Sequence, residues 1–185
     1  MKKIFTLLFV TTFLLTACDG DTGPQGPPGE DGYDNLGFTF ERTFNFDYFS
    51  DGNGFYSHII QIPEEANTIN PDADAVLVYR LERNENSEGN IIDTWSLIPK
   101  SLFTDQGNTV QYSYNHTPLD VEIIIDGNFD LNTLDSGFIN DQTFRVIIIP
   151  SDFLASSNID VTNYEAVSKA FNITDSTIQN IKFQQ

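Results

Sequence analysis

The alternation of apolar and polar residues along short segments is the feature that most limits how this chain can fold. Five aromatic residues occupy alternate positions between residues 38 and 48, and only Arg42 interrupts the series. Successive side chains of a β-strand point to opposite faces, so this pattern predicts a half-buried strand with a bulge or an end at Arg42. The chain is therefore expected to build β-sheets.

Further segments repeat the pattern, and turn residues separate them. Strands are expected at residues 56–62, 75–82, 91–98, 102–104, 109–116, 121–125 and 144–149. The turns at 51–54 and 105–108 predict hairpins, while residues 144–149 are apolar on both faces and predict a central strand. In the segment 75–82 we expect Leu77, Tyr79 and Leu81 to point inward. The fold class predicted is mainly β, an antiparallel β-sandwich of about seven strands.

Near the C-terminus the apolar period changes to that of a helix. Tyr164, Val167 and Phe171 fall on one helical face, which predicts a short helix over about 163–170. Thr162 and Glu165 match a capping box at its start. The apolar stripe is expected to pack on the sandwich or to cover an open edge. Residues 151–155 predict a single turn. The segment 173–183 is ambiguous, because Ile178 and Ile181 fit a helix while its threonine and asparagine content fits a loop or an edge strand.

The first residues have the pattern of an export signal. Two lysines precede an apolar stretch over 4–15, which is shorter than the ~20 residues that a membrane span needs. The run Leu15-Thr16-Ala17-Cys18 resembles the lipobox of bacterial lipoproteins. The resemblance implies cleavage before Cys18, a lipid on its sulfur and an acylated amine, and hence a membrane anchor. An ordinary secretory signal with a chance cysteine is the alternative.

Glycine then occupies every third position from Gly20 to Gly32, and this run resembles collagen. A monomeric polyproline-II spacer is favoured over a trimeric stalk because so few triplets bury little surface. The predicted organisation is a signal peptide (1–17), a lipidated cysteine with a collagen-like stalk (18–36) and a β-sandwich domain with a C-terminal helix (37–185). This layout resembles uncharacterised collagen-like-stalk lipoproteins of Gram-negative bacteria, a resemblance that implies no catalytic residues.

The charge of the chain excludes one class of partner. The formal net charge is −18, and removal of Lys2 and Lys3 with the signal changes it to −18 − 2 = −20. Proteins bind nucleic acid by neutralising phosphates, so binding to nucleic acid is not expected. The acidic balance favours solubility, cation binding or a basic partner.

Candidate ligand positions are few. Asp126, Asn128 and Asp130 alternate as in calcium loops, but the remaining loop positions do not match, and a turn after the preceding strand is the favoured interpretation. His58 and His116 fall inside expected strands, and two histidines without a third ligand make a poor zinc site. No cofactor is expected. The run 175–177 resembles a bacterial O-glycosylation acceptor.

The function hypothesis follows from the anchor more than from the domain. We expect a lipid-anchored, non-catalytic binding or adhesion module of the cell envelope or surface, at the outer rather than the inner membrane, which engages a protein or a glycan. Exposed aromatic residues such as Tyr33, Phe49 and Phe55 are candidates for its binding face. The alternatives are a structural subunit, trimeric through the stalk, and an enzyme acting on envelope polysaccharide.

Overall fold

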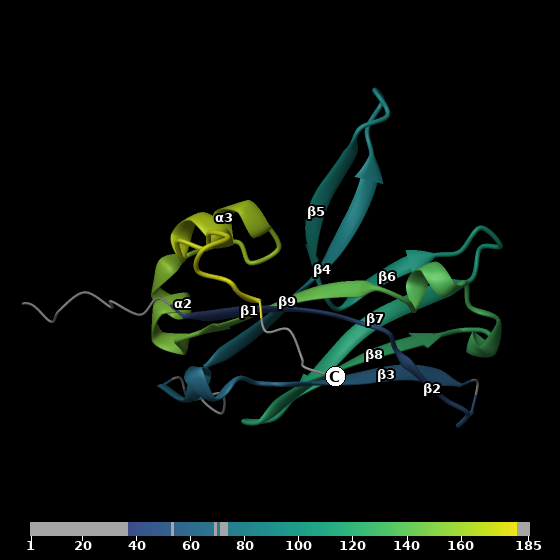
Figure 1. Ribbon diagram of the computed structural model, residues 1–185, viewed down its shortest axis with the longest axis horizontal. Helices are drawn as coiled ribbons and strands as arrows, with labels where there is room; N and C mark the ends of the chain where they lie inside the picture. Colours follow the sequence, from purple (N-terminus) through teal and green to yellow (C-terminus); the bar gives the residue numbers. More distant parts are fainter. Residues whose placement is uncertain (1–36, 53, 69, 71–73, 181–185) are drawn as a thin grey trace, which may run out of the picture. The chain divides into compact units, whose positions relative to one another are not determined.

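The structure, a computed structural model, describes residues 37–52, 54–68, 70 and 74–180. This part of the chain is mainly β and forms two five-stranded sheets, with strand orders β10-β1-β9-β4-β5 (sheet 1) and β2-β3-β8-β7-β6 (sheet 2) (Figure 1). Neighbouring strands pair antiparallel, except that β10 lies parallel to β1. The expectation of a mainly β protein with antiparallel sheets is confirmed.

The elements have the following bounds. Sheet 1 contains β1 (Phe38–Phe44), β4 (Ala75–Glu85), β5 (Ile91–Leu97), β9 (Gln142–Ile149) and β10 (Gln179–Asn180). Sheet 2 contains β2 (Asp47–Phe49), β3 (Phe55–Gln61), β6 (Lys100–Phe103), β7 (Thr109–His116) and β8 (Asp120–Gly127). Short helices are η2 (Glu64–Thr68), η3 (Leu131–Thr133), η4 (Ser136–Phe138), α2 (Ser151–Ser157) and α3 (Tyr164–Ala170). None of these described helices is long and apolar enough to cross a membrane.

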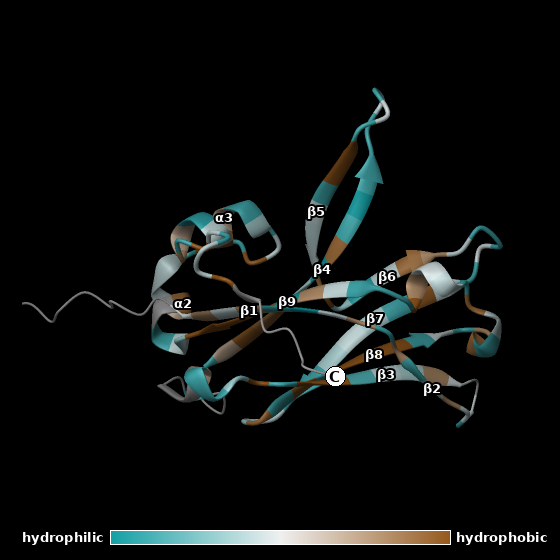
Figure 2. Ribbon diagram, viewed as in Figure 1, coloured by the Kyte–Doolittle hydropathy of each residue, from teal (hydrophilic) through white to brown (hydrophobic). Residues whose placement is uncertain are grey.

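The main core lies between the two sheets. Phe40, Val78 and Phe144 from sheet 1 and Tyr112 and Ile123 from sheet 2 are completely buried in one cluster. These residues occupy alternate positions of their strands, as the period of a strand requires. Figure 2 shows hydrophobic segments along β8 and part of β9, and also on the projecting β5, where Ile91 and Ile92 are exposed.

A second apolar layer covers the outer face of sheet 1. Leu77, Tyr79 and Ile147 point to this face and pack with Val167 of α3 and with Phe171. The hydroxyl of Tyr79 donates a hydrogen bond to the carbonyl of Val161, 2.6 Å away. All eight residues of β9 are buried, since this strand has the core on one face and the helical layer on the other. The expected central strand and the packing of the C-terminal helix on the sheets are both confirmed.

Arg145 ties this helical layer to sheet 1. Its Nη2 lies 2.7 Å from Oε2 of Glu41 on β1, and its guanidinium lies 4.0 Å from the ring centroid of Trp95 on β5. Another nitrogen of Arg145 donates to the hydroxyl of Tyr164 on α3. One cation therefore joins two strands and a helix, in a site where its side chain is only 11% exposed.

The structure corrects three sequence expectations. The segment 38–48 is not one strand: β1 pairs with β9 without a break as far as Phe44, the chain then crosses at 45–46, and β2 joins sheet 2. Arg42 neither bulges nor ends the strand; its Nη1 donates to the carbonyl of Glu41, and its guanidinium lies 5.2 Å from the ring centroid of Phe40. With this division and the addition of β10, the described residues form ten strands instead of about seven.

The second correction concerns β4. Leu77 and Tyr79 do not face the other sheet but the helices, while Val76 and Val78 fill the main core. Both faces of this strand are covered, so its residue pattern alone did not indicate which of the two alternating series of side chains faces the main core.

The third correction concerns the start of α3. The N-cap is Asn163, whose side chain accepts from the backbone N–H of Ala166 at 3.2 Å. Thr162 instead donates its hydroxyl to Asp160, so the predicted capping box is wrong by one residue.

Candidate functional site

The candidate site lies where sheet 1 divides. Pairing between β4 and β9 runs from Ala75↔Ile149 to Arg80↔Phe144, whereas pairing between β4 and β5 continues to Glu85↔Ile91. Beyond Arg80 the β4–β5 hairpin therefore leaves β9 and projects away from the sheets (Figure 1). We call the gap between the projecting part of β4 and the start of β9 the fork.

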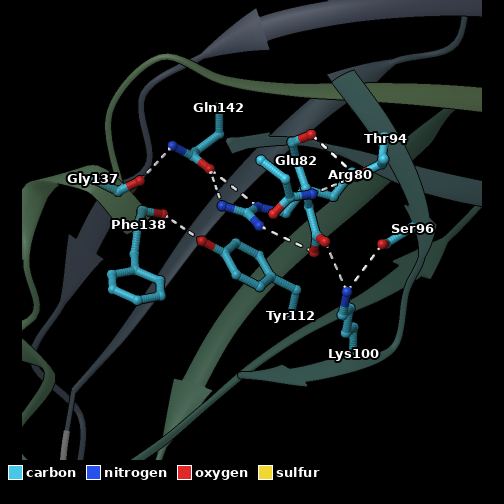
Figure 3. Close-up of polar contacts among 10 residues, drawn as sticks. Arg80, Glu82, Thr94, Ser96, Lys100, Tyr112, Gly137, Phe138 and Gln142 are labelled. Carbon is cyan, nitrogen blue, oxygen red and sulfur yellow. Dashed lines mark hydrogen bonds and ion pairs between the residues drawn. The ribbon is translucent and has the colours of Figure 1, made fainter. Parts of the chain in front are cut away.

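Gln142 bridges the two sides of the fork with both ends of its amide. Its Oε1 accepts from Nε and Nη2 of Arg80 at 3.1 and 2.8 Å. Its Nε2 donates to the carbonyl of Gly137 at 2.9 Å (Figure 3) and to that of Asn140 at 2.6 Å. The loop before β9 is thereby fixed to β4, although the two strands no longer pair.

Arg80 continues the inward face of β4 after Val76 and Val78, but it meets polar groups. Its guanidinium lies 4.4 Å from the ring centroid of Tyr112 on β7, within the range of a cation–π contact. The hydroxyl of Tyr112 donates to the carbonyl of Phe138 at 2.7 Å. Burial raises the pKa of Tyr112 to about 12, so this phenol stays a neutral donor.

Glu82 comes two residues later on the same face and lies beside Arg80 and Lys100 (Figure 3). Its Oε2 lies 2.8 Å from Nζ of Lys100, which also donates to Oγ of Ser96 at 3.0 Å. Its Oε1 is 3.5 Å from Nη1 of Arg80 and is buried without a hydrogen bond from the described residues. A buried acceptor of this kind costs free energy until a donor reaches it.

A cleft of about 650 Å³ opens at the fork beside this network. Its volume falls within the ~300–1,000 Å³ typical of ligand pockets. The residues that line it are Arg80, Leu81, Glu82, Arg83, Asn84, Leu102, Gly137, Phe138, Asn140, Asp141, Gln142 and Thr143. Two arginines and two acids among them balance, so the cleft is a neutral region in a strongly acidic protein.

A second hollow of about 460 Å³ shares Phe138, the last residue of η4, with the cleft. Phe103, at the end of β6, lines it and is 75% exposed. Asp105 and Asp135 add carboxylates, and Oδ1 of Asp135 is engaged by the backbone N–H of Gly137 at 2.7 Å. This hollow is smaller, and one of its two acids, Asp135, is occupied in holding η4.

The three calcium candidates hold the turn after β8. Asp126 accepts from the N–H of Gly127, Asn128 from the N–H of Thr109, and Asp130 from the N–H of Asn132, at 2.7, 2.9 and 3.0 Å. In the part of the chain that the structure describes, no group of three or more His, Cys, Asp or Glu side chains is placed to hold a metal ion.

The histidines lie apart from each other. His58 on β3 stacks on Phe44 with ring centroids 3.9 Å apart, and His116 at the end of β7 is exposed. The strand β8 lies between β3 and β7, so the structure does not bring the two together. Burial lowers the pKa of His58, which favours a neutral ring packed against Phe44.

Other predicted positions have less structural context. Cys18, the stalk and Tyr33 lie outside the described residues. Phe49 is exposed and stacks on Phe55 with centroids 5.0 Å apart. The run 175–177 is exposed in a turn that follows α3.

Sequence reasoning missed the residues of the fork, although a signal was present. Arg80 and Glu82 interrupt the apolar series that Val76 and Val78 begin, and Gln142 does the same before Phe144. Polar residues that extend an apolar face mark a place where the core gives way to a polar network. The network can position hydrogen-bonding groups rigidly for a ligand in the cleft.

No family model matches the chain, and neither a curated protein nor a solved structure matches it.

Proposed function

We propose that the protein is a lipid-anchored, non-catalytic binding module of the cell envelope, and that the cleft at the fork is its binding site. The observation that carries the binding site is the network around Arg80, which fixes the walls of a neutral cleft through five elements. Preorganised walls lower the cost of ordering on binding. The charged groups of the network are engaged with one another, which supports a binding role rather than a catalytic one.

The anchor in this proposal is Cys18. The lipobox and the short apolar stretch before it support attachment of lipid, and two or more acyl chains hold a protein stably on a membrane. The glycine-rich run 20–32 supports a spacer between that membrane and the domain, in a monomeric protein whose preferred location is the outer membrane.

The anchor is tested by metabolic labelling with an alkyne fatty acid. The wild-type protein is expected to carry the label, and Cys18→Ala to lack it and to leave the membrane fraction. Label that persists in the alanine variant would overturn the anchor at this residue.

The binding site is tested with the mature wild-type protein and two matched variants. Asn140 is exposed and lines the cleft, so Asn140→Trp is expected to fill the cleft and to reduce binding to isolated envelope fractions at least tenfold, or about 1.4 kcal/mol. Asn115→Trp places the same side chain on the exposed outer face of sheet 2 and is the control. Equal binding by the two variants would contradict the assignment of the cleft.

A further inference from the structure

At the fork, one edge of β4 has no strand partner among the described residues. From Leu81 to Glu85 this strand pairs with β5 on one side, and its pairing with β9 has ended at Arg80 among the described residues. An unpaired edge presents backbone donors and acceptors to whatever lies beside it. Here it forms one wall of the cleft, because Leu81, Arg83 and Asn84 belong to the lining.

The direction of the backbone groups of β4 follows from two hydrogen bonds. The carbonyl of Val78 accepts from the N–H of Ile98, and the carbonyl of Glu82 accepts from Oγ1 of Thr94, both on the β5 side. In a strand the N–H and C=O of one residue point to the same side and alternate along the chain. The N–H and C=O groups of Leu81 and Arg83 therefore point into the fork.

We propose that an extended peptide binds in the fork by adding to β4 as a strand. Its backbone pairs with the free groups of Leu81 and Arg83, and Gln142 and Thr143 form the opposite wall. The proposal rests on the proposed binding function and names the class of partner. Peptide recognition by addition to a sheet edge draws its affinity from main-chain hydrogen bonds and its specificity from alternate side chains.

Glu82 indicates one side chain of that peptide. Glu82 lies on the cleft lining with its side chain 16% exposed, and its Oε1 is buried 3.5 Å from Nη1 of Arg80 without a hydrogen bond from the described residues. A turn of this side chain toward the cleft would bring the carboxylate to a donor of the peptide. Lys100 and Arg80 already place two cations beside this carboxylate and balance its charge. The peptide therefore needs to supply only a neutral hydrogen-bond donor, such as serine, threonine or asparagine.

The charges exclude an acidic peptide. The charged residues of the lining balance, and the mature chain at −18 − 2 = −20 repels anions. The charged side chains of Glu82, Arg83 and Glu85 also disfavour indiscriminate pairing at this edge, as charges on natural edge strands do. The occupant is therefore a neutral extended segment with a hydroxyl or amide side chain opposite Glu82.

The first test uses synthetic peptides of alternating threonine and valine, about ten residues long and capped at both ends, with serine, asparagine or aspartate at the central position. Each has a twin that is N-methylated at alternate residues, which removes strand donors and keeps the side chains. Binding to the full mature protein is followed by fluorescence anisotropy and by amide hydrogen exchange. The serine and asparagine peptides are expected to slow exchange at Leu81 and Arg83, and the methylated twins to have no effect. Equal effects of both twins would overturn strand addition.

The second test changes the protein. Arg83→Pro removes the N–H that points into the fork and keeps the donors that face β5, whereas Arg83→Ala keeps the N–H and removes the same side chain. The proline variant is expected to bind the peptides about fivefold to tenfold more weakly than the alanine variant, which has lost the same side chain but keeps the N–H. Equal binding by the two variants would contradict a hydrogen bond from this N–H. Unfolding in urea shows whether the proline variant is folded, and the methylated peptides test the proposal on the wild-type protein in either case.

The outcomes separate this inference from the proposed function. Loss of envelope binding in Asn140→Trp, with unchanged binding in Arg83→Pro and no discrimination between peptide twins, would overturn strand addition and leave the cleft as the site. Unchanged envelope binding in Asn140→Trp would overturn the cleft, and strand addition with it.

Discussion

The outer faces of the two sheets differ, although the sheets share one core. On sheet 1 the helices α2 and α3 lie over a second apolar layer, in which Ile147 is completely buried. On sheet 2 most outward residues remain in contact with solvent, and Ile59 is 54% exposed there. This difference is present in the residue patterns: the segments covered on both faces, 75–79 and 146–149, are apolar throughout, whereas strands covered on one face alternate. The position of an isoleucine relative to the helical layer should therefore determine how much its side chain contributes to the free energy of unfolding.

The largest expected effect comes from truncating an isoleucine on each face. Ile147→Ala removes a buried side chain between sheet and helices and should lower the free energy of unfolding by about 3–4 kcal/mol. Ile59→Ala makes the same change on the open face and should stay within ~0.5 kcal/mol. Urea denaturation of both variants measures the difference. A large loss in Ile59→Ala would indicate that sheet 2 is covered in solution, for example by a second copy of the chain.

High pH provides a second and smaller test of the covered face. Burial, with lesser contributions from the neighbouring tyrosines and Asp160, raises the pKa of Tyr79 far above the ~10 of an unfolded chain. Its contribution to stability is complete below pH 10. As the pH rises further, the unfolded state loses the proton first, and the free energy of unfolding falls by about 1.4 kcal/mol per pH unit.

Tyr79→Phe should remove this dependence on pH. Between pH 10 and 12 the free energy of unfolding of the wild type should therefore fall by about 2–3 kcal/mol more than that of the variant. Other groups that titrate in this range affect both proteins and cancel in the comparison. Urea unfolding at each pH measures it. Parallel curves would show that water reaches this hydroxyl and that the helical layer is open at Val161.

Residue patterns predicted the covered face well where one period dominated. Apolar residues on both faces identified β9, turn residues identified the hairpins, and helical spacing identified α3. The crossing at 45–46 was missed because the aromatic alternation continues from β1 into β2, although the two strands belong to different sheets. A local period carries no information about which sheet a strand joins.

The fork could be predicted only in part. The sequence contains the polar interruptions at Arg80, Glu82 and Gln142, but their meeting depends on contacts over 62 residues of separation. The same applies to Arg145 and Glu41, which are 104 residues apart. Such pairs are set by sheet register, which is a property of the whole fold.

The smallest expected effect concerns the start of α3, the helix that distinguishes the two faces. Asn163→Ala removes the side chain that accepts from the N–H of Ala166 and should lower the free energy of unfolding by about 1 kcal/mol. Thr162→Ala removes an exposed hydroxyl bonded to Asp160 and should cost no more than a few tenths of a kcal/mol. The difference is measurable by urea denaturation, with Ile59→Ala as an unaffected reference. If Thr162→Ala were the more harmful change, the helix would begin one residue earlier in solution, and the capping box would be its start after all.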